Sequence, residues 1–253
     1  MKNLKRRFFI KSSSLVAGGL VLPSFNINRM ANSANNKKLK VSVVGCGGRG
    51  TGAAVQALRA DENVELVAMA DAFKDRLEKS LNAIKQEFEG EKKIEVKEKN
   101  MLVGFNGYKK AIDLADVVIL ATPPGFRPLH FKYAIDQDKH VFMEKPVATD
   151  AHGVRQVLET AKVANQKKLN VVVGLQRRYQ YSYLNILKQV RRGVIGKITS
   201  GQVRWNGAGV WVRERQPNQT EMEYQMRNWY YFNWLCGDHI CLLYTSDAAD
   251  DLI

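Results

Sequence analysis

Residues 39–52 read LKVSVVGCGGRGTG, an apolar run at 39–44 that passes into a glycine-rich turn. Gly45, Gly47 and Gly50 fit the pattern G-x-G-x-x-G. In that pattern the first glycine permits a tight turn, the second lets a pyrophosphate approach the backbone, and the third lets the following helix pack on the strand. The free N–H groups at the start of such a helix attract phosphate oxygens. The stretch therefore predicts a strand, a phosphate-binding turn and a helix.

A second apolar run, 64–70, ends in Asp71, about 20 residues beyond the last glycine of the turn. An acidic side chain at this spacing binds the ribose 2′-hydroxyl of a dinucleotide. Because a carboxylate repels the 2′-phosphate of NADP, we predict NAD as the cofactor, with NADP as the alternative. A plain loop and a surface cap are the alternative interpretations of the turn and of Asp71.

Apolar runs and amphipathic stretches alternate along the rest of the chain, which is typical of a parallel sheet covered by helices. The fold class predicted is α/β, with a Rossmann-type doubly wound parallel sheet. Strands are expected at 64–70, just before Phe105, and at 116–121, 140–143, 171–174 and 198–205. Helices are expected at 53–60, 74–88, 108–114, 128–138 and 181–192, and a loop or insertion at 89–100.

Polar residues follow two of the predicted strands. Thr122 and Pro123 come after the strand 116–121, and Glu144 and Lys145 follow the next one. Because parallel strands end at the same edge of a sheet, we expect these residues beside the glycine turn. A lysine of lowered pKa can take the proton of a secondary alcohol while hydride leaves for a nicotinamide, so Lys145 is the predicted catalytic residue. Glu144 would bind the cofactor or orient the lysine; an ordinary ion pair is the alternative.

Other candidates are less specific. His130 would line the nicotinamide site or serve as a packing histidine, and Arg177, just past the strand 171–174, could reach cofactor or substrate. The four tryptophans would form a sugar-stacking wall or pack in the core: Trp205, Trp211, Trp229 and Trp234.

Four segments together resemble the Gfo/Idh/MocA oxidoreductases, a family named for glucose-fructose oxidoreductase and inositol dehydrogenase. They are Gly45-Cys46-Gly47-Gly48-Arg49-Gly50, Ala121-Thr122-Pro123 with His130, Glu144-Lys145-Pro146, and VGLQRRY at 173–179. The resemblance implies an NAD(P)-binding Rossmann domain at 38–175, with Gly48 and Arg49 in its cofactor site. From 176 it implies the start of a substrate domain, an incomplete α/β domain with a largely antiparallel open sheet.

Secreted members of this family act on sugars and polyols, so the resemblance implies an NAD(P)-dependent oxidoreductase of a sugar-like secondary alcohol. Two alternatives remain, a glycosidase that uses bound NAD in a redox-neutral cycle and a non-catalytic nucleotide-binding protein. Release of sugar without accumulation of NADH would identify the first, and full function after Lys145→Ala the second. The full-length protein could form a homo-oligomer.

The first residues resemble a twin-arginine export signal, Lys5-Arg6-Arg7-Phe8-Phe9-Ile10-Lys11. The apolar run that follows, 15–22, is shorter than the roughly 18 residues that span a bilayer. We therefore predict a signal peptide and linker at 1–35, recognition by the twin-arginine machinery, and a periplasmic or otherwise exported protein. A basic tail is the alternative.

The charge of the chain is concentrated at this end. The net charge is +14, and residues 1–40 hold nine of the 39 Lys and Arg and none of the 25 Asp and Glu. The remaining excess is dispersed and no nucleic-acid motif accompanies it, so we expect a solvated basic surface and no nucleic-acid partner. Three cysteines indicate no disulfide framework, and no metal site is predicted.

Residues 241–251, CLLYTSDAADD, resemble the translated adapter of transposon-based sequencing libraries. We therefore expect 241–253 to be an artefact and 176–240 to be only the beginning of the substrate domain. The resemblance places an acidic residue and a catalytic histidine beyond Ile240, so residues 1–253 alone are expected to be inactive.

Overall fold

The computed structural model describes residues 38–202, 204, 209–238 and 241–242. The chain divides into two compact units, 1–36 and 37–253, and the account below concerns the second. The predictions for the export signal, for Trp205 and for residues 243–253 lie outside the described residues.

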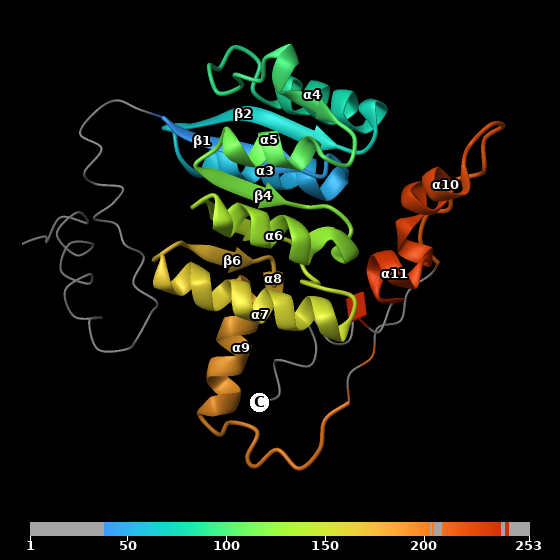
Figure 1. Ribbon diagram of the computed structural model, residues 1–253. Helices are drawn as coiled ribbons and strands as arrows, with labels where there is room; N and C mark the ends of the chain where they lie inside the picture. Colours follow the sequence, from blue (N-terminus) through green and yellow to red (C-terminus); the bar gives the residue numbers. More distant parts are fainter. Residues whose placement is uncertain (1–37, 203, 205–208, 239–240, 243–253) are drawn as a thin grey trace, which may run out of the picture. The chain divides into compact units, whose positions relative to one another are not determined.

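Six parallel strands form one sheet in the order β3-β2-β1-β4-β5-β6 (Figure 1). This is the common strand order of doubly wound dinucleotide-binding folds, in which the chain reverses its direction of travel between β1 and β4. The predicted Rossmann-type fold is therefore confirmed. The strands are β1 (Leu39–Val44), β2 (Val64–Asp71), β3 (Met101–Val103), β4 (Val117–Leu120), β5 (His140–Met143) and β6 (Val171–Val173).

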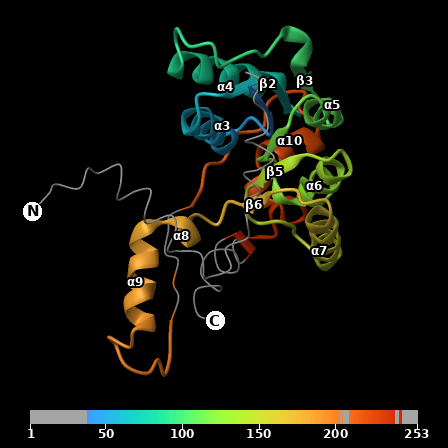
Figure 2. The same cartoon turned by 90° about the vertical axis from the view of Figure 1, so that its left-hand side faces the viewer.

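Helices cover both faces of this sheet. Figures 1 and 2 show α3 and α4 on one face and α5, α6 and α7 on the other. These helices are α3 (Gly48–Ala60), α4 (Lys74–Glu87), α5 (Gly107–Asp113), α6 (Arg127–Asp136) and α7 (Ala151–Gln166). The remaining ones are α8 (Gln176–Tyr179), α9 (Tyr181–Arg191), α10 (Glu221–Arg227), α11 (Asn233–Cys236), η1 (Glu98–Asn100), η2 (Pro124–Phe126) and η3 (Trp229–Tyr231).

Side chains of β1 point to both faces of the sheet and enter two separate apolar cores. Val41 and Val43 pack in the core under α3 and α4, and Val44 packs in the core under α5, α6 and α7. Leu58 and Phe131, one in each core, are fully buried. Each such side chain stabilises the fold by about 1.5–3 kcal/mol, and together the two cores fix the edge of the sheet at which β1 and β4 end.

The predicted bounds of β1 and β5 agree with the structure, and the other predicted strands and helices up to α9 differ by a few residues; no helix is predicted where α8 lies. Helix α7 occupies a stretch for which the sequence analysis predicts no element, and its N-cap residue Asp150 accepts a hydrogen bond from Gly153 N at 2.6 Å. The strand predicted at 198–205 is wrong for the described part of that stretch, 198–202 and 204, which is exposed and pairs with no strand. A strand needs a neighbour to satisfy its backbone groups. The antiparallel second sheet stays a prediction.

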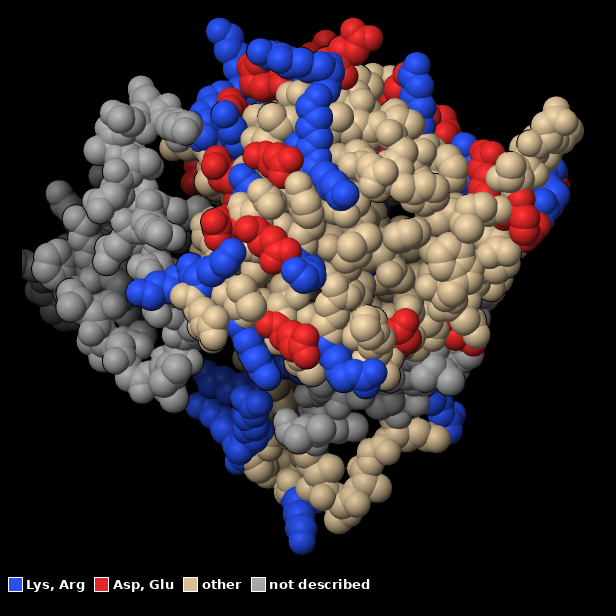
Figure 3. All heavy atoms as spheres, viewed as in Figure 1, with Lys and Arg blue, Asp and Glu red and all other residues tan. Residues whose placement is uncertain are grey.

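The surface in Figure 3 shows how the charge is distributed on one face. Lys and Arg alternate with Asp and Glu over the sheet and its helices, and basic side chains gather around α9. Within the described residues, no helix combines the length and apolar character needed to cross a membrane.

Candidate functional site

The glycine turn brings the end of β1, the start of α3 and the end of β4 within backbone contact. Gly45 has a φ of +98°, and a Cβ there would lie 2.5 Å from Thr122 N. A Cβ on Gly50 would lie 1.9 Å from Gly45 O. Side chains larger than hydrogen cannot occupy either position without moving backbone, which is the physical reason for glycine at both.

The same turn leaves the first turn of α3 open to an anion. Apart from the chain neighbours and the backbone of α3 itself, no described atom lies within 4 Å of a Cβ built on Gly48, and the only one that close to Gly47 is Arg76 Nη1 at 4.0 Å. The described side chains provide neither a cap nor an acidic residue at this end of the 13-residue helix. Its first N–H groups and the positive end of the helix dipole can therefore bind phosphate oxygens.

Asp71 stands at the end of β2 with its carboxylate fixed by two backbone donors. Cys46 N donates to Oδ2 at 2.7 Å, and Phe73 N donates to Oδ1 at 2.9 Å. Burial raises the pKa of Asp71, and these two hydrogen bonds oppose the rise. The carboxylate oxygens keep acceptor sites for a hydroxyl partner, because each has a second lone pair.

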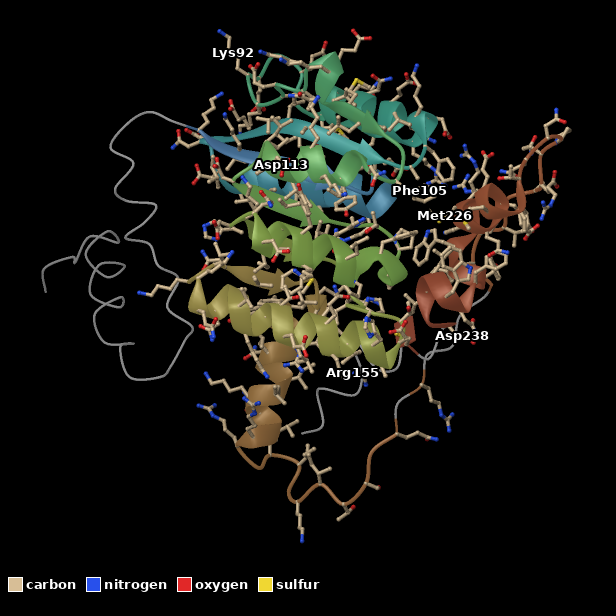
Figure 4. All side chains as sticks on the ribbon, in the orientation of Figure 1. Lys92, Phe105, Asp113, Arg155, Met226 and Asp238 are labelled. Atoms are coloured by element: carbon tan, nitrogen blue, oxygen red, sulfur yellow. The ribbon has the colours of Figure 1, made fainter. Side chains whose placement is uncertain are left out.

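A pocket of about 240 Å³ opens in front of Asp71 and the glycine turn. It contains six of the predicted site residues: Gly45, Gly47, Asp71, Thr122, Pro123 and His130. Among the described residues, its lining includes neither Glu144 nor Lys145. The pocket thus lies at the ends of β3, β2, β1 and β4, the side that bears Asp71. Phe105 and Met226 approach it from the β3–α5 loop and from α10 (Figure 4).

His130 is held neutral within this site. Its Nδ1 lies 3.2 Å from Thr122 Oγ1. Its ring packs against Tyr108, at a centroid distance of 4.3 Å, and against Phe126, at 6.0 Å. Burial, followed by the charge of Arg127, lowers the pKa of His130 to about 3. At neutral pH the imidazole can therefore exchange hydrogen bonds but carries no charge.

Arg127 is a structural residue that the sequence analysis missed. It is 1% exposed and donates from Nη1 to Leu120 O and from Nη2 to Thr122 O, which fixes the chain just beyond β4. Burial lowers the pKa of Arg127 to about 10, and the charge of Glu144 opposes that shift. The helix dipole disfavours a cation at the first residue of a helix, so an arginine at this position is the sequence signal that could have indicated a structural role.

Glu144 connects the glycine turn to β5 and β6. Arg49 Nε donates to Glu144 Oε1 at 2.6 Å, with the glutamate side chain 12% exposed and the arginine side chain 50% exposed. A Cβ on Gly174 would lie 2.8 Å from the same carboxylate oxygen. Glycine at 174 therefore leaves the space that the Glu144 side chain needs, and the structure brings Arg49, Glu144 and Lys145 to one edge as predicted.

Lys145 follows Glu144 and precedes a cis peptide bond to Pro146. Its Nζ donates to Leu242 O at 2.5 Å. Leu242 itself is 4% exposed, so this part of the edge is covered by chain from the far end of the sequence.

Arg177 is not brought into the pocket. Its Nε donates to Tyr183 Oη at 3.2 Å, and its guanidinium carbon lies 5.6 Å from the centre of that ring, in α9.

Of the tryptophans, Trp229 lines the pocket, with Trp211 beside it at a centroid distance of 6.3 Å. Phe73, Arg76, Met226 and Trp229 are therefore pocket residues that the sequence analysis did not assign to the nucleotide site.

The arrangement fits a dinucleotide. Glycines that a Cβ would crowd, an open helix N-terminus and a fixed carboxylate surround one pocket, and these are the groups that recognise pyrophosphate and ribose. No group of three or more potential metal-ligating His, Cys, Asp or Glu occurs in the described part of the chain.

Comparison with known proteins agrees with this site. The model of the oxidoreductase family with an NAD-binding Rossmann fold, GFO_IDH_MocA, matches residues 39–174. Glycosyl hydrolase family 109 protein 1 of Shewanella sp. (strain ANA-3) is 26% identical over 250 residues, which cover 90% of this chain and 50% of the relative. An alpha-N-acetylgalactosaminidase of Shewanella oneidensis is 26% identical over 251 residues, with the same shares covered. The chain spans about half the length of these curated relatives.

Solved structures show the same fold. Myo-inositol 2-dehydrogenase from Lactobacillus plantarum is 28% identical with a TM-score of 0.51, covering 64% of this chain and 43% of that one. Scyllo-inositol dehydrogenase from Lactobacillus casei, solved with bound NAD(H) and scyllo-inositol, is 25% identical with a TM-score of 0.51, covering 64% and 44%.

Proposed function

The chain belongs to the Gfo/Idh/MocA oxidoreductase family with its NAD-binding Rossmann fold, and from this premise we propose that the protein oxidises or reduces a sugar-like secondary alcohol or ketone with NAD as its cofactor. The observation that supports the proposal is that the glycine turn and Asp71 line one pocket at the ends of β1 and β2, while Arg49 of α3 pairs with Glu144 just beyond β5. A solved protein with a similar fold, the scyllo-inositol dehydrogenase, holds NAD(H), which supports NAD as the cofactor.

Each residue has a defined task in this proposal. The turn at Gly47 and Gly48 binds the pyrophosphate, and Asp71 accepts a hydrogen bond from the ribose. NAD, when bound, supplies the hydride acceptor. Lys145 removes the proton of the substrate hydroxyl as hydride leaves the carbon, and returns it in the reverse direction. Glu144, which accepts a hydrogen bond from Arg49 at 2.6 Å, would bind the cofactor or orient the lysine.

The test is steady-state NADH formation by the whole protein with a panel of inositols, sugars and N-acetylated sugars, measured without substitution, for Lys145→Met and for the control Lys132→Met. Lys132 lies on α6 and pairs with Asp136 at 2.6 Å on the surface. Loss of a general acid–base group is expected to slow turnover by about 10²–10⁴-fold, while NAD still binds. Unchanged turnover of Lys145→Met would contradict the catalytic role and favour a non-catalytic nucleotide-binding protein.

A redox-neutral glycosidase is the second candidate, and the names of the curated relatives favour it. Such an enzyme would oxidise its sugar, eliminate the leaving group, add water in its place and reduce the sugar again, so the cofactor returns to its starting state. The test is release of p-nitrophenol from an N-acetylgalactosaminide without net NADH formation. Alcohol-dependent accumulation of NADH and no release of p-nitrophenol would support the dehydrogenase instead.

Export remains part of the proposal, together with a homo-oligomeric full-length protein. The support for export is the Arg6-Arg7 pair, the apolar run 15–22 and the shortage of acidic residues before 41. Fusion of residues 1–40 to a reporter should deliver the reporter to the periplasm, and replacement of Arg6 and Arg7 by lysine should keep it in the cytoplasm. Periplasmic delivery of the double-lysine fusion would contradict the twin-arginine route.

A further inference from the structure

Residues 221–238, here named the strap, lie beyond the segment that the family model matches and reach the nucleotide pocket. The strap comprises α10, η3 and α11, which lie at the end of the sheet where the strands finish (Figure 1). Met226 and Trp229 of the strap line the pocket that Asp71 also lines. Met226 is 7% exposed and lines the pocket together with Phe105, near which Figure 4 shows it.

One anchor fixes the strap to the loop that carries Asp71. Arg227 donates from Nη1 and Nη2 to the two carboxylate oxygens of Asp75, at 3.0 and 3.1 Å. Its guanidinium carbon lies 4.1 Å from the centre of the Phe73 ring, and Phe73 N is one of the two donors that hold the Asp71 carboxylate. A bidentate pair of this kind fixes orientation as well as distance, so the strap is aligned with the ribose-binding residue.

A second anchor fixes the other end of the strap to the turn after β4. Leu235 is fully buried, and a Cβ on Gly125 would lie 2.5 Å from Trp234 O. The strap backbone therefore rests directly on η2, next to Thr122 and Pro123. With both ends anchored, the strap side chains that line the pocket, Met226 and Trp229, are held in place.

We propose that Met226 and Trp229 form the outer wall of the nucleotide site and contact the adenosine half of the cofactor. The inference rests on the proposed function, and the position of the pocket supports it, because the lining includes Asp71 but, among the described residues, not Lys145. An indole and a thioether offer polarizable, apolar surface suited to a purine. A wall anchored through Arg227 would slow departure of the cofactor, which a redox-neutral cycle requires.

The experiment measures binding of NAD and of AMP to the whole chain by calorimetry. Met226→Ala and Trp229→Leu should each lower the affinity for both ligands by about tenfold. Met222→Ala is the matched control, because Met222 is one turn away on α10 and 52% exposed; its affinities should stay unchanged. Trp229→Phe, which keeps an aromatic face, should restore most of the affinity and guards against a merely misfolded variant.

The anchor is tested separately with Arg227→Ala against Arg215→Ala. Arg215 makes contacts of the same kind, an ion pair with Glu221 and a guanidinium carbon 4.2 Å from the Tyr224 ring. Both of these partners lie in α10, so this pair does not join the strap to the residues that follow Asp71. Arg227→Ala should speed NAD dissociation several-fold and Arg215→Ala should not. If Met226→Ala and Trp229→Leu bind AMP and NAD as tightly as the unsubstituted chain does, the proposal that these two side chains contact the cofactor is wrong. A parent chain that binds neither ligand would overturn the proposed function itself.

Discussion

Replacement of Gly50 by alanine tests the packing of the glycine turn most severely. A Cβ at this position would lie 1.9 Å from Gly45 O, whereas real Cβ atoms essentially never approach closer than 3.0 Å. The difference, 3.0 minus 1.9, requires a displacement of at least 1.1 Å between the turn and α3. The turn resists this displacement because Gly45 N donates to Ala70 O at 2.8 Å. We therefore expect a loss of about 3 kcal/mol in the free energy of unfolding, the upper end for overpacking.

Urea unfolding followed by circular dichroism measures this loss, and Gly48→Ala is the matched control. Gly48 lies in the same turn of α3, and a Cβ there meets no described atom within 4 Å. Alanine in place of this helical glycine should leave stability unchanged or raise it by up to about 1 kcal/mol. Equal stability of the two variants would refute the close approach of the helix to the turn.

Three further predictions concern the groups around the site. Gly174→Ala should displace the flexible Glu144 carboxylate, 2.8 Å from the new Cβ, and lower turnover about tenfold at a stability cost below about 1 kcal/mol, as kinetics and urea unfolding would show. Hydrogen bonds from Arg227 lower the pKa of Asp75 from its ordinary value of 3.8. Their contribution to stability is therefore present above pH 3.8 and is lost as the pH falls through the lowered pKa. Asp75→Asn should remove this part of the acid dependence of the melting temperature. Burial raises the pKa of the Cys46 thiol well above its usual value, so iodoacetamide should label it only after unfolding; rapid labelling of the folded chain would contradict its burial.

Local sequence signals predict the sheet and the turn because these elements depend on neighbouring residues. The β-branched run of β1 and the following glycines determine where the strand ends, and the structure agrees to the residue. The spacing between Gly50 and Asp71 is also local to one βαβ unit. The helix α7 could have been found in the same way, since Asp150 is a standard N-cap residue.

Tertiary contacts were not predictable in this way. Asp75 and Arg227 are 152 residues apart, and nothing in either local pattern indicates that they meet. The sequence predicts Trp229 as a sugar-stacking or core residue, yet it lines the pocket because the strap is anchored there. Arg177 shows the opposite case: it follows a predicted strand closely, but its side chain is directed to Tyr183 in α9.

Competitive binding of NAD and NADP to the parent chain and to Asp71→Asn tests the central claim most directly. Asparagine keeps the shape of the side chain and removes its charge. We predict that the parent binds NAD at least about tenfold more tightly than NADP, and that the variant largely loses this preference. Failure of the parent to bind NAD, or an unchanged preference in Asp71→Asn, would contradict the assignment of this sheet edge as the nucleotide site.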